Sequence, residues 1–168
     1  MANVFAKFEG GAQTPEGEAT DNAHSKWIDL ESVSVSVMRP IQMGATGRKR
    51  TLGGPQFSEV SCSSQLSAAS NNIMTGVANG TVFATVTIHF CRAGAEGKKA
   101  HEPYEIWTLL NVIVTNYSVS GAADGGLFES WGLAYTNLSR KYSKEGVKDG
   151  KTATAGEFKW DLETAQVE

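Results

Sequence analysis

The stretch VFATVTIHFCR, residues 82–92, decides the fold. Apolar side chains occupy alternate positions along it, at Val82, Ala84, Val86, Ile88 and Phe90. Successive side chains of a β-strand point to opposite faces of a sheet, so this alternation predicts a strand with its even positions toward the core. Two-residue periodicity of this quality favours a protein built mainly from strands.

Other extended patterns lie on both sides of this strand. Short strands are predicted at residues 4–8, 57–62 and 158–162, between clusters of Gly, Asn, Asp and Pro. Residues 104–119 are apolar on both parities, a pattern typical of a central strand covered on both faces. Seven or eight strands are expected in all.

Two of these patterns change parity along their length. In residues 26–37 the apolar positions move from even to odd, which predicts a β-bulge near Glu31 and Ser32. Residues 128–142 change from odd to even in the same manner, so a second bent strand with a bulge is expected there. A bulge keeps both halves of such a strand facing one core.

A single helix interrupts the strands after residue 69. Ser70 is the expected N-cap, Ile73, Met74 and Val77 form an apolar stripe, and Asn79 with Gly80 supply the left-handed stop. Many short strands with one helix predict an all-β-dominated fold: a small closed antiparallel β-barrel or sandwich with one short flanking α-helix and a long extended loop.

Length and charge set the class of protein. The chain has 168 residues, enough for one domain, and its 15 Lys and Arg against 18 Asp and Glu give a net charge of −3. A net-acidic chain does not attract nucleic acid, and no apolar run reaches the ~18 residues of a membrane span. The N-terminus has no signal-peptide pattern, so the protein is expected to fold in the cytoplasm without one.

Residues able to carry chemistry are sparse and scattered. His24, His89 and His101 have no metal-ligand spacing, and we expect them in a polar loop, in mid-strand and in a Lys-rich turn. Cys62 and Cys91 lack a CxxC spacing and are expected to be reduced thiols. We therefore expect no catalytic residues, no metal and no cofactor, and predict that the chain is not an enzyme. The four tryptophans, which could line a sugar platform, lie in strand patterns and are expected in the core: Trp27, Trp107, Trp131 and Trp160.

The connection Met38–Gln56 is unusual for its length and its composition. Nineteen residues without a periodic pattern exceed the ~12–15 typical of a structureless loop in a compact domain. Met38, Ile41, Met43 and Leu52 are apolar, and a solvated loop gains nothing by exposing them. We predict that these four side chains form a subunit interface.

Five segments match one known family in collinear order along the chain. They are GEATDNAHSKWIDL at 17–30, VTIHFCRAG at 86–94, LLNVIVTNYSVSG at 109–121, ESWGLAYTNLSRKY at 129–142 and KWDL at 159–162. In these segments the sequence resembles the haemolysin-coregulated protein (Hcp) family, the tube protein of bacterial type VI secretion. Ala19 stands where that family usually has Ser, and the helix start and the 38–56 loop depart from its pattern.

The resemblance implies a complete set of expectations about function. Residues 1–168 would be a single Hcp-like tube domain without an appended effector domain, forming homohexameric rings that stack into a secreted tube. Its partners would be a contractile sheath, a valine-glycine-repeat spike protein and effector proteins in the lumen, with no nucleic acid and no membrane insertion. The alternative from the residues alone is a monomeric all-β module that binds carbohydrate or protein.

Overall fold

The computed structural model describes residues 4–44, 49–92, 101–123, 125–145 and 152–167. In this part of the chain the fold is all-β with one helix, as predicted. Ten strands form one antiparallel sheet. They are β1 (Val4–Glu9), β2 (Ile28–Leu30), β3 (Ser32–Ser34), β8 (Val60–Gln65), β9 (Val82–Cys91), β10 (Pro103–Gly121), β11 (Leu127–Ala134), β12 (Asn137–Glu145), β13 (Thr152–Asp161) and β14 (Gln166–Val167).

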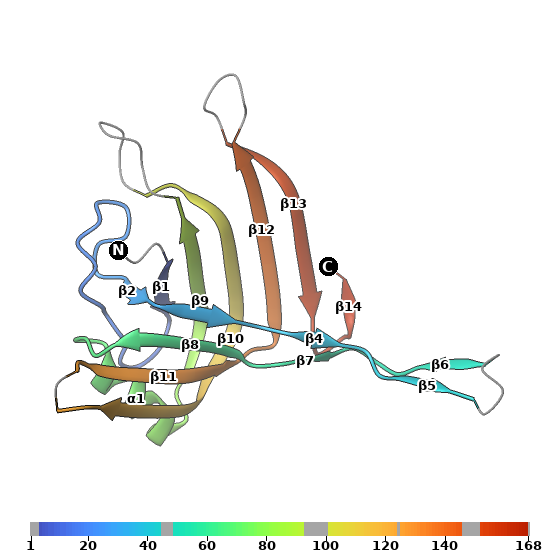
Figure 1. Ribbon diagram of the computed structural model, residues 1–168, viewed down its shortest axis with the longest axis horizontal. Helices are drawn as coiled ribbons and strands as arrows, with labels where there is room; N and C mark the ends of the chain where they lie inside the picture. The colour runs from blue at the N-terminus through green and yellow to red at the C-terminus, as the bar shows by residue number, and fades with distance from the viewer. Residues whose placement is uncertain (1–3, 45–48, 93–100, 124, 146–151, 168) are drawn as a thin grey trace.

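Strand β10 organises the sheet because its two halves have different neighbours. Its first half lies between β9 and β12, and its second half pairs with β11. The order then runs β11-β8-β3 on one side, β12-β13-β14 on another, and β9-β1-β2 on the third. Figure 1 shows β10 bending between these two environments, so that β8 and β11 cross the direction of β12 and β13.

The predicted closure of the sheet is wrong, although the predicted class is confirmed. β2 pairs with β1, and β3 pairs with β8. β2 and β3 follow each other along the chain, with a break at Glu31, and they do not pair with each other. The ladder of hydrogen bonds therefore does not continue around a closed barrel. The chain changes partner there, and the Glu31 backbone N–H donates to the Ser63 carbonyl at 2.8 Å. Buried Leu30 and half-buried Val33 lie on opposite parities, as the predicted bulge requires.

The prediction that residues 104–119 are covered on both faces is also wrong. Leu109 and Val112 are fully buried, whereas the neighbouring Leu110 and Ile113 are each 38% exposed. The buried parity switches at Asn111, whose φ of 50° is left-handed, and this local reversal turns both halves of β10 toward the core. The strand therefore has one core face that changes parity.

The same switch affects β9, which pairs with β10. Val86 and Ile88 are buried as predicted, but Phe83 is buried instead of Val82, which is half exposed. Phe83 packs edge-on against Phe8, and Phe8 contacts the ring of Trp131, in the centre of the core. The predicted bent strand at 128–142 is two strands, β11 and β12, divided at residues 135–136.

Helix α1 (Ser70–Asn79) covers one end of the sheet (Figure 1). Gly80 has the predicted left-handed conformation, with φ of 63°, and its N–H bonds to the last helical turn. Ser70 is not the cap: it is buried inside the first turn, and its Oγ accepts a bond from the Ser67 N–H at 2.9 Å. Ile73 is buried but Met74 is 57% exposed, so Met74 is not part of the stripe. Among the described residues, no helix is long and apolar enough to span a membrane.

Candidate functional site

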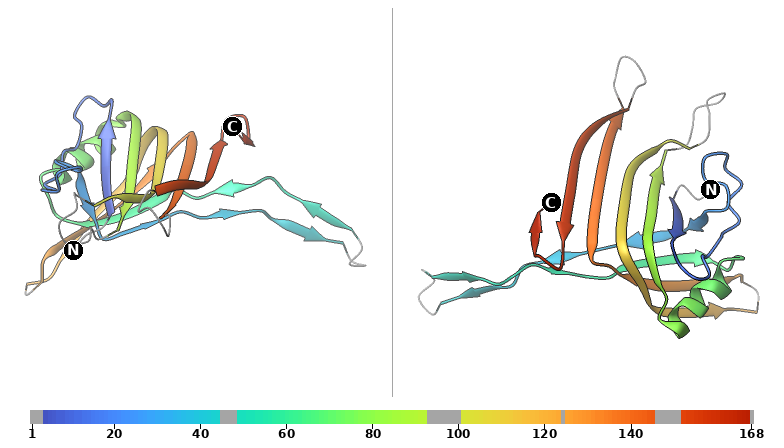
Figure 2. Two further views of the ribbon diagram at one scale, coloured as in Figure 1. Left: turned by 90° about the horizontal axis from the view of Figure 1, so that it is seen from above. Right: turned by 180° about the vertical axis from the view of Figure 1, so that it is seen from behind.

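Residues 37–57 form an arm that projects from the rest of the molecule (Figures 1 and 2). The arm was predicted to lack regular structure, but it is a β-hairpin made of two short ladders. β4 (Val37–Met38) pairs with β7 (Gln56–Phe57), and β5 (Ile41–Met43) pairs with β6 (Arg50–Leu52). Each strand has two or three residues, which is too short for alternation to be recognised in a sequence.

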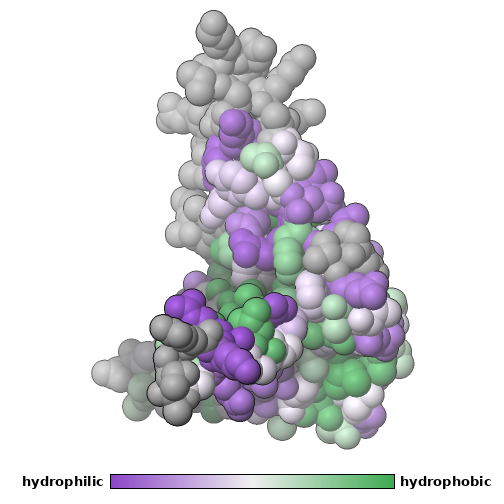
Figure 3. All heavy atoms as spheres, turned by 90° about the vertical axis from the view of Figure 1, so that its right-hand side faces the viewer, coloured by the Kyte–Doolittle hydropathy of each residue, from purple (hydrophilic) through white to green (hydrophobic). Residues whose placement is uncertain are grey.

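All four predicted interface residues lie on this arm and are exposed. Met38, Ile41, Met43 and Leu52 retain 64%, 56%, 65% and 61% of their accessible surface. Ile41 is directly opposite Leu52 across the ladder, and directly opposed residues share one face of a hairpin. The distal ladder therefore has an apolar face. Figure 3, which views the molecule from the side of the arm, shows hydrophobic atoms beside strongly hydrophilic ones there.

Three aromatic rings lie at the base of the arm. Phe57 stacks on Trp160 with ring centroids 5.5 Å apart, and Phe158 lies next to both rings. Trp160 is only partly buried, so the prediction that all tryptophans lie in the core is wrong for this residue and for half-buried Trp27. The stack joins β7 of the arm to β13, because Phe57 and Trp160 come from these two strands.

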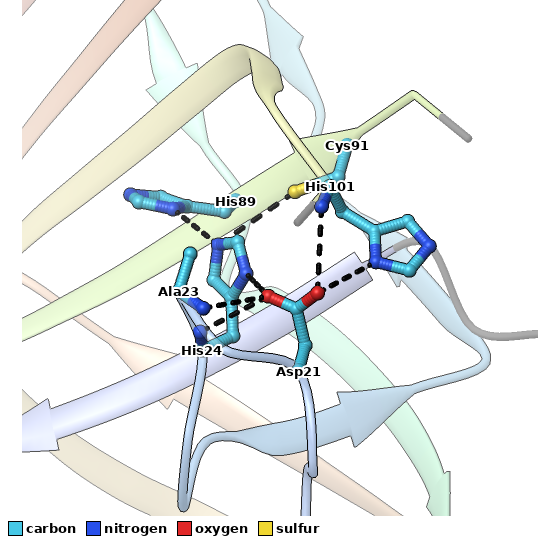
Figure 4. A network of polar contacts seen from close by, with 6 residues as sticks. All are labelled: Asp21, Ala23, His24, His89, Cys91 and His101. Carbon is cyan, nitrogen blue, oxygen red and sulfur yellow. Dashed lines mark hydrogen bonds and ion pairs between the residues drawn. The ribbon is translucent and has the colours of Figure 1, made fainter. Parts of the chain in front are cut away.

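A second notable group is a polar cluster centred on Asp21, which sequence spacing did not reveal (Figure 4). His24 Nδ1 lies 2.7 Å from Asp21 Oδ1, and His101 Nδ1 lies 2.9 Å from Oδ2. On the other side of its ring, His24 Nε2 lies 2.9 Å from His89 Nδ1 and 3.7 Å from Cys91 Sγ. The three histidines predicted to lie in separate surroundings thus form one connected network.

The charge of Asp21 sets the protons of this network. Burial alone would raise the pKa of Asp21, but hydrogen bonds from His101, His24 and backbone N–H groups outweigh it and hold that pKa far below its usual range. An ionised carboxylate only accepts hydrogen bonds, so both Nδ1 atoms that face it carry protons. Burial, followed by the charge of His24, lowers the pKa of His89 to about 4.

The order Asp21, His24, Cys91 is the order of orienting group, base and nucleophile in thiol catalysis. Three observations argue against that activity here. The thiol is buried, burial raises the pKa of Cys91 to about 12, and His24 Nε2 is already hydrogen-bonded to His89. In the part of the chain that the structure describes, no three His, Cys, Asp or Glu side chains are arranged to hold a metal. The cluster instead fastens the segment 17–27 onto β9.

The outer face of β3, β8, β11 and the second half of β10 is rich in serine. Cross-strand partners place Ser32, Ser63, Ser130 and Ser118 in one row across the four strands. Ser32 and Ser63 hydroxyls lie 2.6 Å apart, as do those of Ser118 and Ser130. We call this surface the serine face; it also includes Ser34, Ser61 and Ser120. Its centre carries hydroxyl groups, and the carboxylates of Glu59 and Glu31 lie at its edges, where they accept hydrogen bonds from Thr115 and Gln65.

Comparison with known proteins gives one consistent result. The family model described as "Type VI secretion system effector, Hcp" matches residues 5–142. No curated protein sequence matches the chain.

Solved structures agree with this family. A protein described as a type six secretion system protein is 23% identical, with a TM-score of 0.84 over all of both chains. Hcp1 from Salmonella typhimurium is 21% identical, with a TM-score of 0.76 over all of both chains. A chain in the anti-feeding prophage baseplate is 12% identical, covers 83% of this chain and 93% of its own length, and has a TM-score of 0.52. At these identities the structures show a shared fold, and together with the match over residues 5–142 they establish that this chain belongs to the Hcp family of type VI secretion proteins.

Proposed function

We propose that this chain is a single-domain structural subunit of the type VI secretion tube, which forms hexameric rings that stack and carry effector proteins in their lumen. The exposed apolar arm is the observation that supports this proposal most directly. Monomeric proteins rarely expose contiguous apolar surface, and a hairpin that projects from the body has no use for such a face unless another molecule covers it. Full burial of each of the four side chains contributes up to ~1.5–3 kcal/mol per contact.

A ring needs a heterologous contact, in which one patch of a subunit docks on a different patch of its neighbour. The arm supplies one patch and lies far from most of the body (Figure 2). The rings would then meet the sheath, the valine-glycine-repeat spike and the effectors that the Hcp family implies. The exposed arm favours binding to neighbouring molecules. The Asp21 cluster, whose Cys91 thiol is buried, does not favour turnover of a substrate.

The serine face is our proposed lining of the lumen. Hydroxyl groups offer both donors and acceptors, and without charge they bind no single cargo strongly. Effectors of different charge can therefore pass the same wall. Replacing Ser118 with Trp should leave rings intact while reducing the amount of effector co-purified with them, and the same change at exposed Ala78 of α1 is the matched control.

The assembly experiment uses the cross-strand pair on the arm. The double variant Ile41→Lys with Leu52→Glu keeps opposite charges across the ladder, so the hairpin itself remains paired. Parent protein should scatter light as about six subunits and show rings by negative-stain microscopy, whereas the double variant should remain a folded monomer. The control is Met74→Lys, which changes an equally exposed apolar side chain on α1 and should leave rings unchanged.

Two results would count against this proposal. A parent chain that stays monomeric at all concentrations would overturn the ring and would favour the alternative, a monomeric binding module. Intact rings in the arm variant would show that Ile41 and Leu52 do not lie in the subunit contact. Quenching of tryptophan fluorescence by sugars would specifically support the alternative, through the partly exposed ring of Trp160.

A further inference from the structure

The charges of the arm differ from those of the molecule as a whole. Residues 38–56 contain no Asp or Glu, although the chain carries a net charge of −3. Arg39, Lys49 and Arg50 are exposed, and none of them has an ion-pair partner among the described residues. Arg50 is directly opposite Met43, so a cation borders the apolar face of the distal ladder. The arm is thus both apolar and basic.

A pocket of about 830 Å³ lies beside β1 and β2, at the opposite end of the molecule from the arm (Figure 1). Four apolar side chains line it, from Val4, Phe5, Leu30 and Leu66. Four carboxylates line it as well, from Glu18, Asp21, Asp29 and Glu31. We call this cavity the acidic pocket.

The carboxylates of the acidic pocket lack positively charged partners other than the histidines on Asp21. Among the described residues, Glu18, Asp29 and Glu31 form no ion pair with Lys or Arg, and Glu31 accepts only the Gln65 amide at 2.9 Å. Burial, and then the nearby charge of Asp21, raise the pKa of Asp29. A cation placed beside Asp29 would relieve this repulsion.

We infer that the acidic pocket receives the arm of a second copy of this chain. The arm has an apolar face bordered by unpaired cations, and the pocket has an apolar lining with unpaired carboxylates, so the two surfaces match in both respects. They lie at opposite ends of the molecule, and the arm projects away from its own pocket (Figures 1 and 2). The match can therefore be satisfied only between copies, in the head-to-tail manner that a ring or a stack of rings requires.

This inference rests on the proposed tube function and names the surface that the arm contacts. It also gives the contact a salt dependence that a purely apolar one lacks. Raising the ionic strength from ~0.01 to ~0.15 M shortens the Debye length from ~30 to ~8 Å, so exposed charges at the rim of the contact attract less strongly. Assembly should weaken over this range and should not vanish, because the apolar part of the contact remains.

The test reverses the charges of each surface separately. The arm variant is Lys49→Glu with Arg50→Glu, and the pocket variant is Glu18→Lys with Asp29→Lys, which leaves the structural residue Asp21 in place. Each variant alone should raise the subunit concentration at half-assembly at least tenfold. An equimolar mixture should assemble again, because alternating copies then place a basic arm in an acidic pocket and an acidic arm in a basic pocket. The control is Lys141→Glu with Lys144→Glu on β12, which should assemble like the parent.

Circular dichroism establishes that each variant is folded, and the milder pair Lys49→Gln with Arg50→Gln replaces the arm variant if it is not. Restored assembly in the mixture supports direct contact between arm and pocket. A parent that assembles while both reversed variants assemble equally well would overturn the docking site and leave the ring itself intact. Two folded variants that fail alone and also fail when mixed would equally refute the contact. A parent that never assembles would overturn the ring and the docking site together.

Discussion

Asp21 joins three segments of the chain that are far apart in sequence. Its two carboxylate oxygens bind the rings of His24 and His101, and through His24 it reaches His89 on β9. Hydrogen bonds to a charged group contribute at most ~1.5–3 kcal/mol each, and the partial exposure of Asp21 and His101 lowers this figure, so the cluster makes a moderate contribution to the stability of the end that carries the acidic pocket. The same carboxylate lies on the lining of that pocket, so the cluster also fixes the shape of the pocket.

The pKa of His89 predicts how this cluster responds to acid. The value of about 4 in the folded protein compares with ~6.5 for an unperturbed imidazole. Between these values the unfolded chain binds a proton that the folded chain does not, so the free energy of unfolding should fall as the pH falls from ~6.5 to about 4. One such group contributes at most ~1.4 kcal/mol per pH unit, and partial exposure reduces this.

The variant His89→Asn tests this prediction, because asparagine keeps a polar atom near the position of Nδ1 but does not titrate. Urea unfolding at about pH 7 and about pH 5 should show a smaller loss of stability for the variant than for the parent. Thr85→Asn, a change to the same residue type at a half-buried position of β9, should keep the parent's pH dependence. Equal slopes in parent and His89→Asn would assign the acid sensitivity to another group.

The sequence gives only a weak sign of this cluster. Asp21 and His24 are three residues apart, a spacing at which an Asp side chain accepts bonds from nearby backbone N–H groups, as it does here from Ala23 and His24. Nothing local indicates that His89 and His101 join them, since that depends on the pairing of β1 with β9 and on the path of the chain into β10. The spacing of the three histidines therefore predicts separate surroundings, and this prediction is wrong because the fold brings them together.

At the scale of elements, β10 shows where sequence patterns succeed and where they fail. Its β-branched and aromatic residues predict a long central strand, which the structure confirms. Apolar residues on both parities have two physical explanations: burial on both faces, or a switch in which parity is buried. Asn111 tolerates the left-handed conformation better than most residues, so it is the one local sign of a switch. Its amide also donates to Thr136 Oγ1 at 3.0 Å, which holds the bend against the β11–β12 junction.

Substitutions at Asn111 should separate the two contributions of this residue. Asn111→Gly loses the bond to Thr136 and keeps access to a positive φ, whereas Asn111→Val loses both. A left-handed residue other than Gly costs ~1–2 kcal/mol, so Val should be less stable than Gly by about that amount. Urea unfolding of the two variants under identical conditions measures the difference. The same pair of substitutions at exposed Ser120, which is paired with Phe128 of β11, should reverse the order, because Val suits a strand better than Gly. Equal stability of the two Asn111 variants would mean that the backbone relaxes out of the left-handed region.

The arm shows a different limit of sequence interpretation. Its apolar residues predict a contact surface, which stays a prediction, and the structure shows that these side chains are exposed. The hairpin geometry is not predicted, because its ladders have only two or three residues per strand. Pairing of β4 with β7 depends on where β3 and β8 deliver the two chain ends, which is a property of the sheet. The docking inference depends on that geometry, since Arg50 and Met43 meet only through the register of β5 and β6.

At the scale of the whole molecule, the proposed assembly makes thermal stability depend on protein concentration. Association that involves only the folded chain stabilises it by mass action, so the midpoint of unfolding rises with subunit concentration. The parent should show a rising midpoint over a hundredfold range of concentration. The apolar double variant, Ile41→Lys with Leu52→Glu, should show a constant midpoint near that of the parent at its lowest concentration, because the core of the body contains neither residue. Differential scanning fluorimetry across this range, with Met74→Lys as the control that retains the parent's behaviour, provides the measurement.

A constant midpoint for a parent that light scattering shows to be hexameric would contradict this account, because it would mean that the subunits gain no folding stability from the contact. A midpoint for the apolar double variant that lies below the lowest parent value at all concentrations would show instead that the arm contributes to the fold of its own subunit. Loss of an intermolecular contact cannot destabilise a chain that is already monomeric.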